Sequence, residues 1–230
     1  MLPKIDHPLF TTTLPISKIE IKFRPLLVKE EKLLLLAKES NDLDFIISIM
    51  HQVIENTVHT TIDINKLSII DVQWIFMQLR IQSIGKIIRC SVTDPIDKKE
   101  YSIEIDLTEI YVKPDKVQET IRLSDDLLLQ MKLPGMSDIK NVAIISTDFT
   151  SLSFNLILNC IVSVFDGDTE YSNFTQTELE EFIDSLNSTQ IQAVTDYFNN
   201  LPKLTLKYSY TTVEGELREW EVDKFQDFFI

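Results

Sequence analysis

The segment 71–85 places the strongest constraint on the fold, because as a helix it carries two apolar faces instead of one. At about 100° per residue, the side chains divide between two sides of the helix. One face holds Val72, Ile75, Phe76 and Leu79, and the other holds Trp74, Met77, Ile81 and Ile84. Both apolar faces of such a helix must be covered, by the rest of this protein or in part by a partner. We expect residues 28–58 to cover one face, and β-hairpins or later helices to cover the other.

Composition indicates a folded, soluble protein. The chain has 230 residues, of which 44% are apolar, so it can bury a sizeable core. Its longest apolar run is far shorter than a membrane span, and its N-terminus lacks the pattern of a signal peptide, so we expect no membrane association and a cytoplasmic location. The net charge of −14 disfavours binding to a phosphate backbone, and nucleic acid is therefore not an expected partner.

The first half of the chain predicts an arm followed by a strand, helices and a hairpin. Residues 1–15 contain three prolines and read as an extended N-terminal arm, and the alternation in 16–23 favours a strand. Helical spacing follows in 28–39 and 43–54. Gly85 should stop the helix 71–84, and the period of two in 87–93 and 101–107 then predicts a β-hairpin.

The second half predicts a short strand pair, helices and a second hairpin. The pair spans 120–123 and 127–133, and 151–164 is expected to be helical. Thr175 and Glu178 match a capping box at the start of two amphipathic helices that end at Pro202. A hairpin over 204–212 and 218–223 closes the chain. It aligns with the first hairpin when one turn residue is omitted, which is a weak indication of an internal repeat.

These patterns predict an α+β fold that is mainly helical, with two β-hairpins and a short additional strand pair packed on the helices. After the arm, residues 16–230 are expected to form a single globular domain. Within it, 16–112 contribute helices and the first hairpin, and 113–230 contribute the strand pair, helices and second hairpin.

The sequence shows no signature of catalysis or of a cofactor site. The histidines His7, His51 and His59 lack neighbours at metal-ligand spacing, and ordinary surface or partly packed roles explain them better. Asp166 and Asp168 resemble the start of a calcium loop, but the sixth position lacks the required glycine. Cys90 and Cys160 stand apart, as is typical of a reducing compartment. We therefore expect no enzyme activity, no cofactor and no metal.

Several stretches together carry a resemblance to a known family. They are Phe23-Arg-Pro25 before Lys29-Glu-Glu-Lys32, then Leu79-Arg-Ile-Gln-Ser-Ile-Gly85, and the terminal Phe225-Gln-Asp-Phe-Phe-Ile230. In these stretches the chain resembles the baseplate hub proteins of T-even-type contractile-tailed bacteriophages, the gene product twenty-six group. The strand 127–134 and the helix 175–186 extend the resemblance more loosely. Some members of the group have paired cysteines in the hairpins, whereas Cys90 is single here, with Tyr208 in the equivalent place, which argues against a metal knuckle.

The resemblance implies a non-enzymatic role in building the baseplate hub, in the host cytoplasm and beside other hub proteins. It implies either a hub assembly factor or a hub subunit retained in the virion, and homo-oligomerisation stays open. Candidate partner-binding residues are Arg24, Arg80, Phe228 and Phe229. Each also has a structural interpretation, since the arginines could fix local corners or cover apolar seams, and the phenylalanines could enter the core.

Two other classes of function remain as alternatives. A small acidic enzyme would need Asp166, Asp168, His51 and His59 to meet in one cleft. An inhibitor that mimics nucleic acid would need carboxylates concentrated on one surface, whereas we expect them to be spread along the chain with lysines interleaved.

Overall fold

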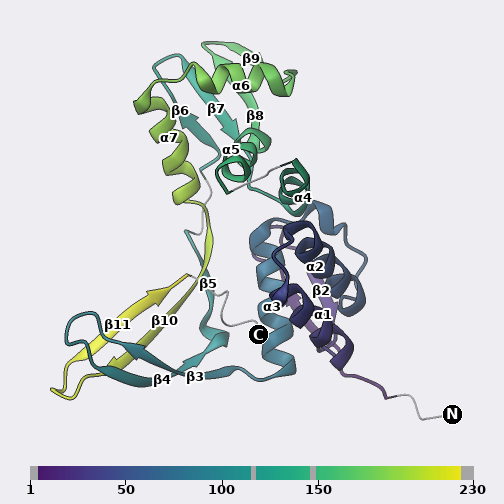
Figure 1. Cartoon of the computed structure of the whole chain (residues 1–230), viewed down its shortest axis with the longest axis vertical. Coiled ribbons are helices and arrows are strands. Elements are labelled where there is room, and N and C mark those ends of the chain that lie inside the picture. The colour runs from purple at the N-terminus through teal and green to yellow at the C-terminus, as the bar shows by residue number, and fades with distance from the viewer. Residues whose placement is uncertain (1–4, 115–117, 146–148, 224–230) are drawn as a thin grey trace. The chain divides into compact units, whose positions relative to one another are not determined.

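Groups of strands and groups of helices follow one another along the described residues (Figure 1). The computed structural model describes residues 5–114, 118–145 and 149–223. The helices are α1 (Val28–Glu39), α2 (Leu43–Thr57), α3 (Ile69–Ser83), α4 (Met136–Ile145), α5 (Phe149–Cys160), α6 (Gln176–Asp184) and α7 (Ser188–Asn199), with short 3-10 turns η1 (Ile64–Lys66) and η2 (Leu107–Glu109). The strands are β1 (Phe10–Thr13), β2 (Glu20–Phe23), β3 (Ile87–Thr93), β4 (Glu100–Asp106), β5 (Tyr111–Lys113), β6 (Thr120–Arg122), β7 (Leu127–Met131), β8 (Ile161–Asp166), β9 (Thr169–Tyr171), β10 (Lys203–Thr211) and β11 (Leu217–Val222).

The expectation of a mainly helical fold is wrong, although the fold does mix helices and strands. Among the described residues, the strands form four sheets of two to four strands each, so strands contribute a large share of the structure. The sequence patterns predict the two long hairpins and the pair β6–β7. They do not predict the short strands β1, β5 and β9, and they favour a helix over most of β8.

The chain divides into two compact units. Unit 1 comprises residues 1–62, 70–113 and 203–230, and unit 2 comprises 63–69 and 114–202. The hairpin β10–β11 belongs with the hairpin β3–β4 in unit 1.

The N-terminal arm is partly folded, which corrects the expectation for residues 1–15. Strand β1 pairs antiparallel with β2, and Phe10 lies opposite Phe23. Leu14, directly after β1, is fully buried. The indole nitrogen of Trp74 in α3 donates a hydrogen bond to Thr12 Oγ1 at 3.0 Å. The single apolar residue in β1 gave too weak an alternation to predict a strand.

Both apolar faces of α3 are largely covered, as the sequence predicts. Val72, Ile75 and Leu79 on the first face are buried, and so is Met77 on the second. Met77 belongs to a core cluster built by the two hairpins, against which Trp74 and Ile81 also pack. Ile84, at the end of the second face, is the exception because it is 63% exposed. Gly85 follows with φ +128°, a conformation that favours glycine and stops the helix.

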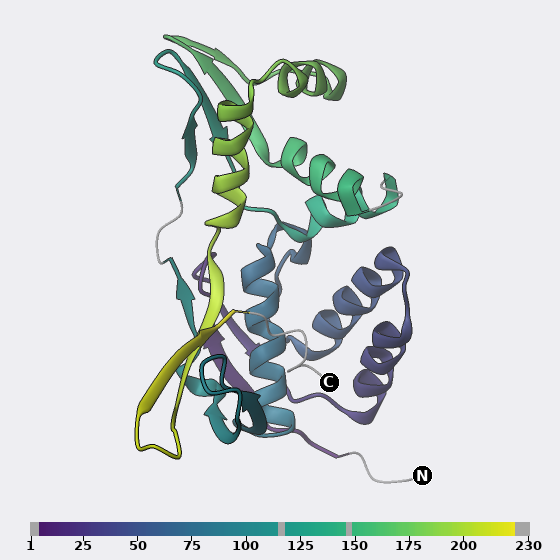
Figure 2. The same cartoon turned by 60° about the vertical axis from the view of Figure 1, so that its left-hand side comes forward.

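The two long hairpins of unit 1 lie side by side in both views (Figures 1 and 2). Strands β3 and β4 pair along seven residues from Ile87↔Asp106 to Thr93↔Glu100. Strand β10 pairs with β11 and, through Lys203↔Lys113, with β5. Their shared core contains Met77, Ile103, Ile105, Leu107, Ile110, Leu204, Leu206 and Tyr210.

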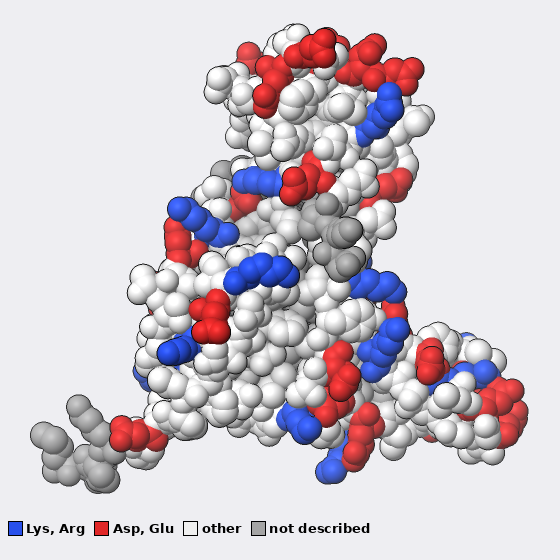
Figure 3. All heavy atoms as spheres, turned by 180° about the vertical axis from the view of Figure 1, so that it is seen from behind, with Lys and Arg blue, Asp and Glu red and all other residues white. Residues whose placement is uncertain are grey.

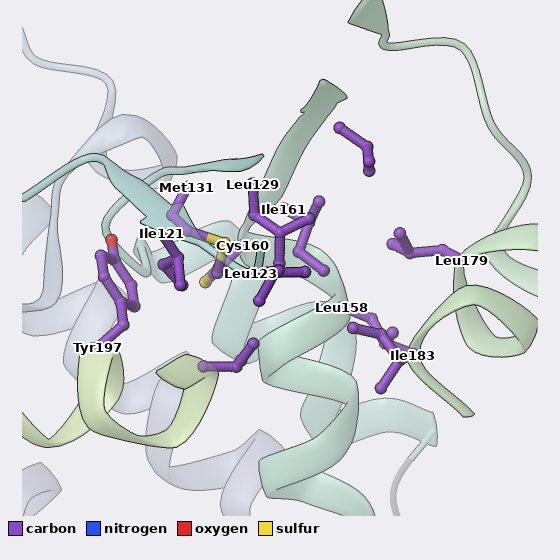
Figure 4. Packing of buried hydrophobic residues seen from close by; sticks show 12 residues of the cluster. Ile121, Leu123, Leu129, Met131, Leu158, Cys160, Ile161, Leu179, Ile183 and Tyr197 are labelled. Atoms are coloured by element: carbon purple, nitrogen blue, oxygen red, sulfur yellow. The ribbon is translucent and has the colours of Figure 1, made fainter. Parts of the chain in front are cut away.

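Unit 2 contains the four-stranded antiparallel sheet β6-β7-β8-β9. Its buried core draws residues from this sheet and from α5, α6 and α7 (Figure 4). The expected helix 151–164 ends at Cys160, and β8 begins at Ile161. The run Ile161-Val-Ser-Val-Phe165 is apolar enough to extend a buried helix pattern, but its β-branched residues also favour a strand, and pairing with β7 decides between them.

The turn between β1 and β2 (the first turn) and the turn between β3 and β4 (the second turn) share a short sequence. Thr13-Leu-Pro-Ile-Ser-Lys-Ile-Glu20 and Thr93-Asp-Pro-Ile-Asp-Lys-Lys-Glu100 share five of eight residues. In both turns the lysine has a positive φ, 59° at Lys18 and 61° at Lys98, and its N–H donates to the carbonyl of the second residue. The second residue is fully buried in each, as Leu14 and as Asp94.

A carboxylate accepts hydrogen bonds from the same two backbone N–H groups in both turns. In the second turn Asp94 accepts from Ile96 N at 2.6 Å and from Asp97 N at 3.2 Å. Leu14 in the first turn has no such group, and Asp71 of α3 accepts from Ile16 N at 2.8 Å and Ser17 N at 3.1 Å instead. The first turn is therefore held to α3, and the second carries its own acceptor.

Candidate partner-binding site

Arg24 fixes the corner between β2 and α1. Its guanidinium donates to both carboxylate oxygens of Glu30, at 2.9 and 3.2 Å, and to the carbonyls of Pro25 and Asn56, both at 2.9 Å. Burial by itself would raise the pKa of Glu30, but the hydrogen bonds from Arg24 and Leu27 outweigh it and lower that pKa. With its side chain only 10% exposed, Arg24 offers little surface to a partner.

Arg80 lies at the C-terminal end of α3. One guanidinium nitrogen donates to the carbonyl of Gly85 at 2.8 Å, where it also complements the negative end of the helix dipole. Partial burial lowers the pKa of Arg80. This geometry matches the structural interpretation of Arg80. The two other candidates, Phe228 and Phe229, lie outside the described residues and stay predictions.

The residues considered for an enzyme are divided between the units. His51 and His59 lie in unit 1, whereas Asp166 and Asp168 lie in unit 2. His51 Nδ1 is 3.4 Å from Glu55 Oε1 on the same helix. Asp166 and Asp168 flank Gly167 in the tight turn between β8 and β9. Across the described residues, no cluster of three or more His, Cys, Asp or Glu side chains could hold a metal ion.

A polar network joins the turns of the two long hairpins. Asp94, in the β3–β4 turn, accepts a hydrogen bond from the Tyr210 hydroxyl of β10 at 2.9 Å. The Tyr210 oxygen in turn accepts from the indole nitrogen of Trp220 at 3.1 Å. Arg218 Nε lies 3.6 Å from Asp94, which adds an attractive charge. Burial alone would raise the pKa of Asp94, but the hydrogen bonds from Ile96, Tyr210 and Asp97 lower it on balance.

A second set of contacts ties the same two turns together. The rings of Tyr101 and Tyr210 stack with their centroids 4.8 Å apart. The Tyr101 hydroxyl donates to Asp97 at 2.6 Å and accepts from the backbone N–H of Val213 at 3.4 Å. Because the contacts of Tyr101 with Tyr210 and Val213 join residues more than 100 positions apart, the two turns form one preorganised structure.

The joined turns present three large apolar side chains to solvent. Ile96 is 63% exposed in the β3–β4 turn, Val213 is 72% exposed in the β10–β11 turn, and Leu217 is 62% exposed at the start of β11. We call these three residues the hairpin-tip surface. Exposed apolar residues on a rigid support are typical of protein interaction sites. Sequence reasoning missed this surface, because hydropathy alone does not show that the two turns meet.

Within the described part of the chain, no helix has both the length and the apolar character needed to cross a bilayer. A family model described as "T4 bacteriophage base plate protein" matches residues 7–230. No curated protein and no solved structure matches the chain.

Proposed function

The chain belongs to the family of T4 bacteriophage base plate proteins, and we propose that within the baseplate it serves the central hub. Family membership gives a structural or assembly role in the phage tail baseplate, which involves other baseplate proteins. The proposal adds that the chain is a hub assembly factor or a hub subunit of a contractile tail. It would act by protein–protein binding in the host cytoplasm, without catalysis.

The match over residues 7–230 carries the baseplate role on which the proposal rests, because it includes nearly the whole chain. The hub assignment is supported by the resemblance of the stretches around Phe23-Arg-Pro25, 79–85 and 225–230 to the gene product twenty-six group. The hairpin-tip surface supports a binding role. Its three exposed apolar side chains stand on turns that the Asp94–Tyr210 and Tyr101–Val213 contacts hold in place.

Co-expression with the hub proteins of the same phage tests the proposal. We expect a complex that survives gel filtration. The double variant Ile96→Ser/Val213→Ser should weaken it, because both side chains are exposed and contribute to the hairpin-tip surface. A matched control is Val28→Ser, which changes a 64% exposed apolar residue on α1. Failure of the unmodified chain to bind any hub protein would refute the hub assignment.

Mass spectrometry of purified particles separates the two forms of the proposal. A hub subunit should be present in a fixed ratio to the other baseplate proteins, whereas an assembly factor should be depleted from finished particles. We favour the assembly factor, and the hub subunit retained in the virion is the alternative.

A further inference from the structure

Positive charge is missing from most of unit 2. Between Lys140 and Lys203 the sequence contains nine Asp and Glu residues and no Lys, Arg or His. The expectation that lysines are interleaved with the carboxylates along the chain is therefore wrong for this part. Acidic side chains gather over the end of unit 2 that contains β9 and α6 (Figure 3). The exposed ones include Asp166, Asp168, Glu170, Glu178, Glu181 and Asp184.

These carboxylates have no cationic partner within the described residues. The ion pairs among the described residues involve other carboxylates, such as Asp138 with Lys132 and Asp125 with Arg122. Glu178 is satisfied locally, because it accepts hydrogen bonds from the N–H and the hydroxyl of Thr175, which lower its pKa. Like charges held close together repel one another, and a cationic partner would relieve that repulsion.

An apolar groove opens among the acidic residues. Its volume is about 280 Å³, and Asp166 and Glu178 are the charged residues in its lining. The apolar lining comes from β7, β8, β9, α6 and the connection between β9 and α6: Leu127, Val164, Tyr171, Phe174, Leu179 and Phe182. This volume lies near the lower end of the range for ligand pockets, which is about 300–1,000 Å³, so it suits one or two side chains better than a whole small molecule.

Local structure holds the walls of the groove in place. Thr175 and Glu178 form a reciprocal capping box at the start of α6, as the sequence predicts. Phe174 precedes this cap, and both Phe174 and Leu179 pack in the core of unit 2, in the positions of a hydrophobic staple. On the opposite wall, Val164 of β8 lies opposite Tyr171 of β9. Tyr171 is 53% exposed, so an incoming side chain can reach its ring.

We propose that this groove binds a basic, amphipathic segment of another baseplate protein. Large apolar side chains of the segment would enter the groove between Tyr171 and Phe182. Its lysines or arginines would lie against Asp166, Glu178 and the neighbouring carboxylates. An acidic segment would meet repulsion, and a basic segment without large apolar residues would leave the groove empty. The identity of the partner as a baseplate protein rests on the proposed function.

Titration of the full-length protein with three synthetic peptides of equal length tests the groove. One peptide combines leucines and lysines, one combines leucines and glutamates, and one combines serines and lysines. We expect the leucine–lysine peptide to bind much more tightly than the other two. The variants Tyr171→Ala and Glu170→Lys/Glu181→Lys should each weaken it roughly tenfold or more, since one removes an exposed aromatic contact and the other reverses the local charge.

A matched control carries Val28→Ala and Glu39→Lys on α1, which are also exposed positions. This control should bind the leucine–lysine peptide as the unmodified chain does. The inference is overturned if the serine–lysine peptide binds equally well, or if the groove variants and the control behave alike. Co-expression with hub proteins separates the two proposals. If complexes form but the groove variants leave them unchanged, the groove inference fails and the baseplate role stands.

Discussion

Arg24 and Glu30 form a buried ion pair whose hydrogen-bonding capacity is largely used. Glu30 is fully buried, and it also accepts the N–H of Leu27 at 2.9 Å. Removing one partner of such a pair leaves an uncompensated charge inside the protein. Arg24 became a candidate because the stretch Phe23-Arg-Pro25 is distinctive. A sequence motif alone does not distinguish an arginine that fixes a corner of the fold from one that binds a partner.

We predict that Arg24→Ala lowers the free energy of unfolding by about 3–5 kcal/mol. Urea denaturation followed by circular dichroism measures this loss. Because the pKa of folded Glu30 is depressed, its contribution is present above the ordinary glutamate pKa and disappears as pH falls through the lower folded value. The difference between unmodified protein and variant should therefore shrink at acidic pH. An undiminished stability with loss of hub binding would instead make Arg24 a binding residue.

Asp71 and Asp94 supply the same hydrogen-bond acceptor to two similar turns, although Asp94 lies within its turn and Asp71 lies in a distant helix. Both accept hydrogen bonds from the N–H groups of the fourth and fifth residues of a Thr-x-Pro-Ile-x-Lys turn. The turn conformation sets the direction of the two N–H groups, so any carboxylate that reaches them can accept their hydrogen bonds. The repeat was visible in the sequence, but the acceptor of the first turn lies in a distant helix and could not be assigned without the structure.

We predict that Asp71→Ala costs about 1–3 kcal/mol, because it leaves two backbone donors without their carboxylate. Introducing Leu14→Asp in the same chain would imitate the second turn and return an acceptor. The double variant should then be more stable than the sum of the single changes predicts. Thermal denaturation of the four proteins of this cycle supplies the coupling energy. Simple additivity would show that the two turns are not equivalent.

At the scale of elements, prediction succeeded where a periodic signal was long. The helix α3 and the two long hairpins have such signals, and the capping box before α6 is a specific local motif; the structure contains all of them. Strands β1, β5 and β9 have only three or four residues and lack the apolar–polar alternation of the equally short β2 and β6. The hairpin-tip surface and the groove at Tyr171 depend on contacts between elements, which no local pattern contains.

The two-faced helix α3 gives a prediction of its own. Met77→Ala and Leu79→Ala remove fully buried side chains from opposite faces, so each should destabilise the protein by about 2–5 kcal/mol. Gln78→Ala, between them on a partly exposed position, should have little effect. Denaturant titration of the three variants measures the difference. If only one of the two core variants is destabilised, α3 has a single structural face.

At the scale of the whole molecule, the two units have separate cores. Met77 and Leu206 belong to a cluster in unit 1, whereas Leu129 and Ile183 belong to one in unit 2. Composition and length predicted enough apolar material for this, but they could not show that residues 203–222 return to the first unit. That return depends on pairing between β10 and β5, which are far apart in the sequence.

Separate cores predict that damage to one unit remains local. Leu129→Ala removes a fully buried side chain from unit 2 and should accelerate amide hydrogen exchange in β6–β9 and α5–α7. Exchange in β3, β4 and α3 should change much less. Mass spectrometry of peptic fragments after timed deuterium labelling measures amide exchange in both units in one experiment. Equal acceleration throughout would show that the protein unfolds as one cooperative whole.

The pairing of Lys113 with Lys203 also has a consequence for the order in which the protein can fold on the ribosome. Strand β5 leaves the ribosome long before β10 has been made. All of residues 114–202 emerge in the interval, which lasts several seconds at a synthesis rate of about 5–20 residues per second. During this interval Asp94 in the β3–β4 turn lacks the hydrogen bond from Tyr210. A nascent chain is therefore left with an incomplete core until its final hairpin arrives, and this interval is when a chaperone would be most useful to it.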